Sequence, residues 1–194
     1  MVEARRRGRP RSEPARRAIL DAALAELEDR GYAALTIEGI AARAGVGKQT
    51  IYRWWPSKAD VVLEALLELA RERVRTPDTG SLAEDLKAFL AATFRARGPR
   101  PILVGLMAQA QFDPAFAVQF RERFLFARRA ALRSIFERAR QRGELGADVD
   151  VEVLLDVVFG VLWYRMLVDH VPLRSSGGVQ LAELILRAIG AVPR

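Results

Sequence analysis

The chain has 194 residues, of which 51% are hydrophobic and 28% charged, enough to bury the core of one or two globular domains. Its formal net charge of +7 favours a polyanionic partner such as nucleic acid, although an anionic membrane surface would suit the same charge. Cysteine is absent, which excludes a disulfide framework and a thiolate zinc site.

No stretch predicts export or membrane insertion. The basic N-terminus has no apolar segment of the signal-peptide kind. The most apolar run, residues 151–168, is interrupted by Glu152, Asp156 and Arg165, which argues against a transmembrane helix. We therefore expect a cytoplasmic protein without a membrane partner.

The first predicted element is a flexible arm over residues 1–14, with five arginines and no apolar periodicity. Arg7, Arg9 and Arg11 alternate with glycine and proline and resemble the core of an AT-hook, which lies in a narrow minor groove. The alternative is a solvated tail that contacts nothing.

Three helices are predicted next. The first covers residues 15–31, with Gly31 as its stop because glycine readily takes the left-handed conformation. Two short helices follow over residues 37–44 and 48–54, and Thr36 is a suitable N-cap for the earlier one. This succession indicates a small helical domain.

The turn between the two short helices covers residues 45–47 and contains Gly45, which fits the three- to four-residue turn of a helix-turn-helix motif. In that motif the second helix, the recognition helix, lies in the major groove with its N-terminal residues against base edges. Here those residues are Lys48, Gln49 and Thr50. Gln pairs with adenine, Lys reaches guanine and the Thr methyl contacts thymine, so we expect all three to contact bases.

Residues 36–58 carry a more specific signature in their side chains. The residues that carry it are Thr36, Ile40, Ala41, Ala44, Gly45, Val46, Thr50, Tyr52, Trp55, Ser57 and Lys58. This pattern closely resembles the DNA-binding signature of the TetR family of bacterial transcriptional regulators. The resemblance extends to individual residues over roughly residues 19–67. Beyond them only the helical architecture is similar. Gly47 departs from it, since the family more often has serine or another N-cap residue there.

The DNA-facing side of the recognition helix follows from helical alternation and from the resemblance. Alternation turns Ile51 and Trp55 inward and leaves Tyr52 and Trp54 toward DNA. The resemblance implies that Tyr52 and Lys58 contact phosphates, with support from Thr36. The expected phosphate contacts are therefore Thr36, Tyr52, Trp54 and Lys58.

A connecting helix is predicted for residues 59–75, and the break Pro-Asp-Thr-Gly at residues 77–80 is the predicted domain boundary. Four parts result. They are an arm at residues 1–14, a helix-turn-helix domain at 15–58, a connecting helix at 59–76, and a ligand-binding and dimerisation domain at 77–194.

Beyond residue 80 the apolar pattern stays helical, without an alternating, strand-like segment. Ser81 and Glu84 have the spacing of a capping box at the start of one helix. The predicted helices cover residues 81–97, 102–112, 114–142, 151–168 and 179–189. The predicted fold class is all-α, with about nine helices in total.

The predicted helix over residues 151–168 is apolar nearly all round, which requires burial on more than one side. In a domain this small, the second burial surface is plausibly another subunit. TetR-like proteins pack their last two long helices into a four-helix dimer interface, so the resemblance also implies a homodimer. The expected interface residues are Leu155, Leu162, Arg165, Leu181, Leu184, Ile185 and Ala188.

Large apolar side chains of the second domain suit a pocket between helices, although plain core packing is the alternative for each of them. The candidates are Phe89, Met107, Phe112, Phe120, Phe124, Phe159, Trp163 and Met166. Arg165 lies among apolar residues and needs a partner. We rank three candidates in decreasing order: an acidic residue of the same chain, the second subunit, and an anionic ligand.

An enzyme is not expected, because the sequence has neither a Gly-rich phosphate loop nor a catalytic cluster, and its one histidine, His170, suits a structural or solvent-facing role. No metal or cofactor is predicted.

The sequence indicates a regulator, most simply a repressor that binds double-stranded DNA and is released by a small apolar or amphipathic effector. The alternatives are an activator, a regulator without a natural ligand and, more remotely, an enzyme or a basic peripheral membrane protein.

Overall fold

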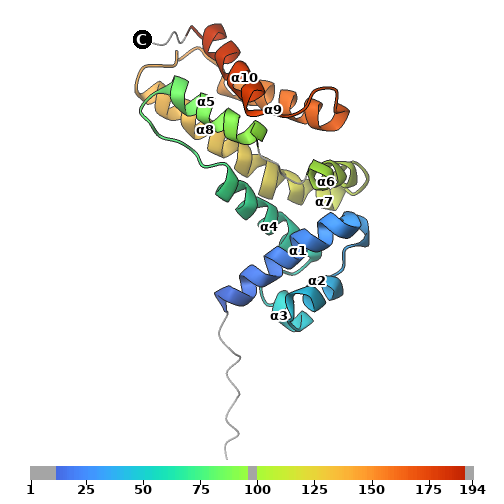
Figure 1. Ribbon diagram of the computed structural model, residues 1–194. Coiled ribbons are helices and arrows are strands. Elements are labelled where there is room, and N and C mark those ends of the chain that lie inside the picture. Colours follow the sequence, from blue (N-terminus) through green and yellow to red (C-terminus); the bar gives the residue numbers. More distant parts are fainter. Residues whose placement is uncertain (1–11, 96–99, 191–194) are drawn as a thin grey trace, which may run out of the picture. The chain divides into compact units, whose positions relative to one another are not determined.

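The computed structural model describes residues 12–95 and 100–190 (Figure 1). Every regular element in these two ranges is helical, which confirms the predicted all-α class. The predicted minor-groove residues Arg7, Arg9 and Arg11 lie outside the described residues. None of the described helices is both long enough and apolar enough to span a bilayer.

The chain divides into two compact units, Met1–Ala65 and Leu66–Arg194. The division falls inside α4, whereas the sequence predicted a boundary at residues 77–80. The helices are α1 Glu13–Ala34, α2 Ile37–Ala44, α3 Lys48–Tyr52, α4 Lys58–Arg73, α5 Leu82–Arg95, α6 Arg100–Phe112, α7 Pro114–Phe120, a π-turn at Arg121–Leu125, α8 Phe126–Gln141, α9 Val151–Val168 and α10 Ser175–Ala188.

In the first unit α1 packs against α2, α2 contacts α3, and side-chain hydrogen bonds join α1 to the start of α4. Its core includes Ile19, Ile40 and Ile51, each without exposed surface. Gly31 has φ +71° and kinks α1, but the element continues to Ala34, so Gly31 interrupts the helix without ending it as predicted. Burial of these branched apolar side chains holds helices that are too short to be stable alone.

The second unit depends on a close crossing of α5 and α10. A Cβ atom on Gly178 would lie 2.3 Å from the carbonyl oxygen of Leu90 and 2.9 Å from the nitrogen of Ala91. Only glycine permits this approach of two backbones. The prediction that the last helix begins at residue 179 is wrong, because α10 begins at Ser175 and uses the Gly177–Gly178 pair inside the helix for packing.

The predicted continuous helix over residues 114–142 is interrupted by the π-turn at Arg121–Leu125. Asp113 caps the start of this run by accepting a hydrogen bond of 3.0 Å from the nitrogen of Phe116. The rings of Phe116, Phe120 and Phe124 stack in sequence, with centroid distances of 5.8 and 5.7 Å. The π-turn therefore interrupts α-helical geometry without breaking the aromatic row.

The loop between α4 and α5 is fixed by buried polar groups. Asp85 is fully buried and accepts hydrogen bonds from the nitrogen and hydroxyl of Thr79, at 2.7 and 2.8 Å. Arg138 donates to the carbonyl oxygen of Pro77. The hydroxyl oxygen of Ser81 accepts a hydrogen bond from the backbone nitrogen of Glu84, so Ser81 is the N-cap of α5 as predicted. The reciprocal bond of a capping box, from the backbone nitrogen of Ser81 to the side chain of Glu84, was predicted wrongly. That nitrogen donates to the hydroxyl oxygen of Thr79 instead.

We predict that Gly178→Ala destabilises the second unit, since its methyl group would overlap the backbone of Leu90. Overpacking costs about 1–3 kcal/mol, and a clash with backbone belongs at the upper end of that range. The melting temperature measured by circular dichroism should fall by several degrees. Gly105→Ala is the matched control, because Gly105 is also helical but has open space around its Cβ position. Equal melting temperatures for the two variants would contradict the close crossing.

Candidate nucleic-acid interface and effector pocket

The helix-turn-helix geometry follows from two local signals. The hydroxyl oxygen of Thr36 accepts a hydrogen bond of 3.0 Å from the nitrogen of Gly39, which begins α2. Gly45 is left-handed, with φ +66° and ψ +32°, and ends α2 as predicted. The helix α3 ends at Tyr52, before the predicted Trp54, because the chain turns there and the nitrogen of Trp54 donates to Ile51.

The recognition helix α3 has one buried side and one exposed side. Ile51 and the following Trp55 are 0% and 1% exposed, which confirms that they point inward. Lys48 and Gln49 are exposed, Thr50 is half-buried and Tyr52 is 48% exposed. The structure thus brings the three predicted base-contacting residues together at the N-terminal end of α3, and their contacts with DNA stay predictions.

Lys48 is paired before any DNA binds. Its Nζ lies 2.9 Å from Oε1 of Glu38 on α2, and both side chains are exposed. The hydrogen bond that Lys48 donates to Glu38 raises the pKa of Lys48 and lowers the pKa of Glu38. Both groups stay charged at neutral pH, so the predicted contact of Lys48 with a base would compete with its ion pair to Glu38.

Lys58 has an internal role that the sequence did not indicate. Its Nζ donates to the carbonyl oxygens of Tyr32 and Leu35, each at 3.0 Å, and lies 4.6 Å from the centroid of the Tyr32 ring. A cation here satisfies carbonyl groups at the end of α1. The predicted phosphate contact would use the remaining N–H of the same ammonium group.

Glu64 on α4 links the recognition helix to the rest of the first unit. It accepts a hydrogen bond of 2.7 Å from Nε1 of Trp55 and one of 3.1 Å from Nε of Arg16, with a second contact from the same guanidinium. Sequence analysis missed this role. The available signal was Trp55 itself, because a buried indole N–H needs an acceptor.

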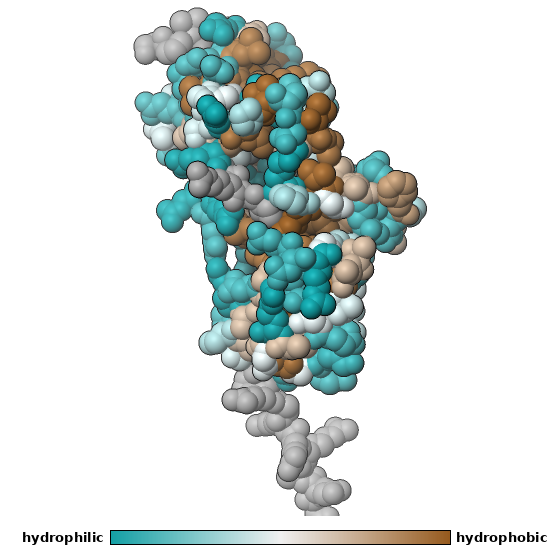
Figure 2. All heavy atoms as spheres, turned by 45° about the vertical axis from the view of Figure 1, so that its right-hand side comes forward, coloured by the Kyte–Doolittle hydropathy of each residue, from teal (hydrophilic) through white to brown (hydrophobic). Residues whose placement is uncertain are grey.

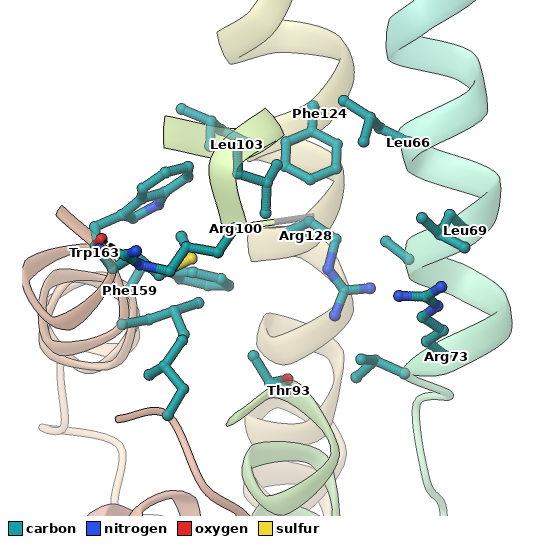
Figure 3. Close-up of a pocket in the computed structure, with 16 residues that line it drawn as sticks. Leu66, Leu69, Arg73, Thr93, Arg100, Leu103, Phe124, Arg128, Phe159 and Trp163 are labelled. Atoms are coloured by element: carbon teal, nitrogen blue, oxygen red, sulfur yellow. Dashed lines mark hydrogen bonds between the residues drawn. The ribbon is translucent and has the colours of Figure 1, made fainter. Parts of the chain in front are cut away.

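A pocket of about 120 Å³ lies within the second unit (Figure 3). Leu66, Leu69 and Arg73 reach it from α4, and Phe159 and Trp163 reach it from α9. Its lining residues are Leu66, Leu69, Ala70, Arg73, Val74, Thr93, Arg100, Leu103, Phe124, Leu125, Arg128, Phe159, Leu162, Trp163, Met166 and Leu173. The walls are therefore mostly apolar, with a few basic side chains.

Half of the predicted pocket residues line this pocket. Phe124, Phe159, Trp163 and Met166 do so, and their contact with an effector stays a prediction. The other four were wrong for this pocket because they pack elsewhere or face solvent. Phe89 and Phe120 are core residues, Met107 lies outside the lining, and Phe112 is 87% exposed. Sequence analysis missed the contribution of α4 and the basic residue Arg128.

Arg128 is the most buried cation of the pocket. It is 9% exposed, and its guanidinium carbon lies 5.4 Å from the centroid of the Phe89 ring. Burial lowers its pKa, and the nearby positive charge of Arg71 lowers it further. By contrast, Arg100 is compensated, since it lies 3.2 Å from the carboxylate of Asp169 and donates to the carbonyl oxygen of Met166.

The predicted interface residues divide between the core and the surface. Leu155, Leu162, Leu181 and Ile185 are at most 9% exposed inside their own subunit, so their assignment to a dimer interface was wrong. Leu184 is 56% exposed and Ala188 is also exposed. Helix α9 is apolar nearly all round, and for this reason its sequence does not indicate which side stays free.

Arg165 has an aromatic partner rather than an acidic one. Its guanidinium carbon lies 5.8 Å from the centroid of the Phe94 ring. No acidic residue within residues 12–95 and 100–190 forms an ion pair with it, so the first-ranked expectation was wrong. Its place in an interface stays a prediction.

An exposed apolar row runs along α9 at alternating spacings of four and three residues, which is the spacing of a helix–helix seam. The row consists of Val153, Val157, Gly160, Tyr164 and Leu167. Figure 2 shows apolar side chains gathered on the visible face of the second unit. His170 is exposed beside this row, with its ring centroid 4.8 Å from that of Tyr164. In the described ranges no group of His, Asp and Glu is arranged to hold a metal ion.

A capped helix-turn-helix unit, followed by a helical unit with an apolar pocket, defines a DNA-binding transcriptional regulator. The family model for "Bacterial regulatory proteins, tetR family" matches residues 19–65, and that for "Tetracyclin repressor-like, C-terminal domain" matches residues 76–185. The chain belongs to the TetR family.

Individual relatives agree with this assignment. The chain is 38% identical over 189 residues to the HTH-type transcriptional regulator YdeS of Bacillus subtilis, covering 96% of this chain and 94% of that protein. It is 30% identical to the DNA-binding transcriptional repressor TetR of Mycobacteroides abscessus, over 80% of this chain and 84% of that one. The crystal structure of the TetR family transcription regulator SCO0332 superposes with a TM-score of 0.76 at 32% identity, covering 94% and 100% of the two chains. These relatives are transcriptional regulators, not enzymes.

We predict that Glu64→Ala destabilises the first unit, because it leaves the indole N–H of Trp55 and the guanidinium of Arg16 without their acceptor. Losing the acceptor of partly buried donors costs about 1–3 kcal/mol. The loss should appear as earlier thermal unfolding in tryptophan fluorescence and as weaker binding to all DNA. Glu28→Ala, at an exposed position of α1, removes the same charge and should leave both measurements nearly unchanged. Similar melting curves for both variants would show that Glu64 does not position the recognition helix.

We predict that Glu38→Gln strengthens binding to both operator and random DNA. The substitution removes a negative charge beside the DNA-facing side and frees Lys48, so the gain should be several-fold at low salt and shrink as salt screens it. Fluorescence anisotropy at two salt concentrations measures it. Unchanged or weaker binding at low salt would mean that the Glu38–Lys48 pair orders α3 for binding rather than competing with DNA.

Proposed function

We propose that this chain is a repressor that binds a pseudo-palindromic operator as a homodimer and is released by a small effector. The observation that carries the proposal is the two-sided recognition helix, with Ile51 and Trp55 locked inside and Lys48 and Gln49 exposed. A row of hydrogen-bonding side chains on a fixed short helix is what major-groove readout requires. The repressor of Mycobacteroides abscessus among the relatives supports the direction of regulation.

The DNA contacts divide into two kinds in this proposal. Lys48, Gln49 and Thr50 read base edges, while the phosphate contacts set register and orientation. The phosphate contacts are Thr36, Tyr52, Trp54 and Lys58. Lys58 joins this set although two of its N–H groups hold the end of α1.

A homodimer would place two recognition helices on one operator, with half-sites related by the two-fold axis. The exposed row on α9 and the exposed Leu184 and Ala188 of α10 are the surfaces that suit this contact. Gly160 lies within the row and has open space around its Cβ position, which permits a second helix to approach closely.

Effector release requires a connection between pocket and DNA. Helix α4 supplies one in the covalent chain, because Leu66, Leu69 and Arg73 line the pocket while Lys58 starts the same helix. A helix of 16 residues is roughly 24 Å long, so α4 extends from Lys58 to the pocket residues in one continuous element. An effector that prefers one position of α4 shifts the protein population away from DNA, by no more than its differential affinity for the two states.

The proposal is tested by selecting bound sequences from a random DNA library and comparing two variants on the selected site and on random DNA. Gln49→Ala should lose specificity at particular base pairs, by about 1–3 kcal/mol. Tyr52→Phe should weaken binding to both DNAs by a similar factor. An unstructured set of selected sequences, without two-fold symmetry, would contradict the operator proposal.

We predict that Val157→Glu converts the dimer to a monomer, because it places a charge in the centre of the proposed α9 seam. Light scattering at micromolar concentration measures the mass, and operator affinity should fall with it. Val118→Glu is the matched control, because Val118 and Val157 are both 41% exposed and Val118 lies on α7, outside the seam. A dimeric Val157→Glu protein would exclude this face as the interface.

A further inference from the structure

The pocket contains a buried positive charge without a counter-charge. Arg128 is 9% exposed, and in the described part of the chain its side chain forms no hydrogen bond or ion pair. It faces the Phe89 ring at 5.4 Å. Figure 3 shows its guanidinium extending from α8 into the pocket, on the side toward α4, from which Arg73 also reaches inward.

This position is costly for the ligand-free protein. A guanidinium cannot lose its proton under ordinary conditions, so burial is not relieved by neutralisation. Two other arginines of the same unit, Arg129 and Arg100, are compensated. Arg129 reaches Glu152 at 2.9 Å and Asp156 at 2.6 Å, and Arg100 reaches Asp169 at 3.2 Å. Arg128 instead has the like charge of Arg71 nearby.

We propose that the pocket binds an apolar monocarboxylate, whose carboxylate pairs with Arg128 and whose hydrocarbon part contacts Phe124, Phe159 and Trp163. The inference rests on the proposed effector function and names the chemical class of the effector. Arg128 is then a specificity-determining residue, and its missing partner is supplied by the ligand.

Shape and charge both favour this class. A guanidinium presents paired donors that match the two oxygens of a carboxylate. One unpaired cation suits a monoanion better than a dianion, which would bring a second charge into an apolar site. The pocket volume of about 120 Å³ is near that of an apolar cavity that holds one benzene ring. Small aryl acids and medium-chain acids are therefore the probes to use.

The experiment measures binding of benzoate, 4-phenylbutyrate and octanoate to the full chain by calorimetry, each against its neutral amide. Each acid should bind at least 10-fold tighter than its amide, since an ionic hydrogen bond replaces a neutral one. Release of the selected operator is followed with the same compounds by fluorescence anisotropy.

Two variants separate a ligand site from a structural arginine. Arg128→Met keeps an unbranched, flexible side chain without the guanidinium and should weaken acid binding on the order of 10- to 100-fold while leaving amide binding unchanged. Because it removes an uncompensated buried charge, it should also raise the melting temperature of the ligand-free protein. Arg129→Met removes the same charge one residue away. It breaks two ion pairs and should lower the melting temperature without changing the preference for acids.

The outcomes distinguish this inference from the proposed function. If amides and acids bind and release the operator equally, the charge inference is overturned and effector release stands. If acids bind through Arg128 without affecting the operator, the inference stands and effector release fails. If none of the probes binds, or if Arg128→Met lowers the melting temperature and leaves acid binding intact, Arg128 is structural and the inference is overturned.

Discussion

The hydrogen bond from Trp55 to Glu64 is the constraint on which the position of α3 depends. The recognition helix has only five residues, and a helix that short has no stability of its own in water. Its orientation is imposed from the buried side, where Trp55 is 1% exposed and its indole N–H lies 2.7 Å from Glu64. Glu64 in turn is held by Arg16 of α1. The surface that we propose to read bases is thus positioned by buried contacts behind it, which is how precise sites are usually supported.

Of the three buried charged residues in the described ranges, two have partners inside their own unit. The first unit compensates its buried or half-buried charges internally, as with Glu26, which is 5% exposed and lies near Arg30 at 3.2 Å and Arg43 at 3.1 Å. The second unit does the same at Asp85, which ties down the loop before α5. Arg128 is the exception, and it lies in the pocket. Departures from local satisfaction are expected at functional sites, where stability is given up for binding.

Helix bounds were predicted best from the sequence where the residues that determine them are neighbours in the chain. The N-cap Thr36 and the left-handed Gly45 fix α2 to the residue, and α9 has its predicted bounds because Asp150 caps it and Asp169 ends it. Elsewhere the deciding partner lies far along the chain. From the local sequence, Gly177 and Gly178 predict a loop, yet in the structure they allow α10 to pack closely against α5. Likewise, an aromatic residue such as Phe89 is apolar in any setting, and only the packed structure separates core from pocket.

The energetics of the pocket explain how a small ligand could act on a DNA complex. In the ligand-free protein Arg128 lies in an apolar pocket without a counter-charge, so an anion gains more there than its hydrocarbon burial alone provides. That gain is useful for regulation only to the extent that it differs between the DNA-bound and the released state of the protein. Leu69 and Arg73 are the α4 residues through which such a difference would arise, since they share the pocket with Arg128. By linkage, operator DNA must then weaken anion binding by the same factor by which the anion weakens operator binding.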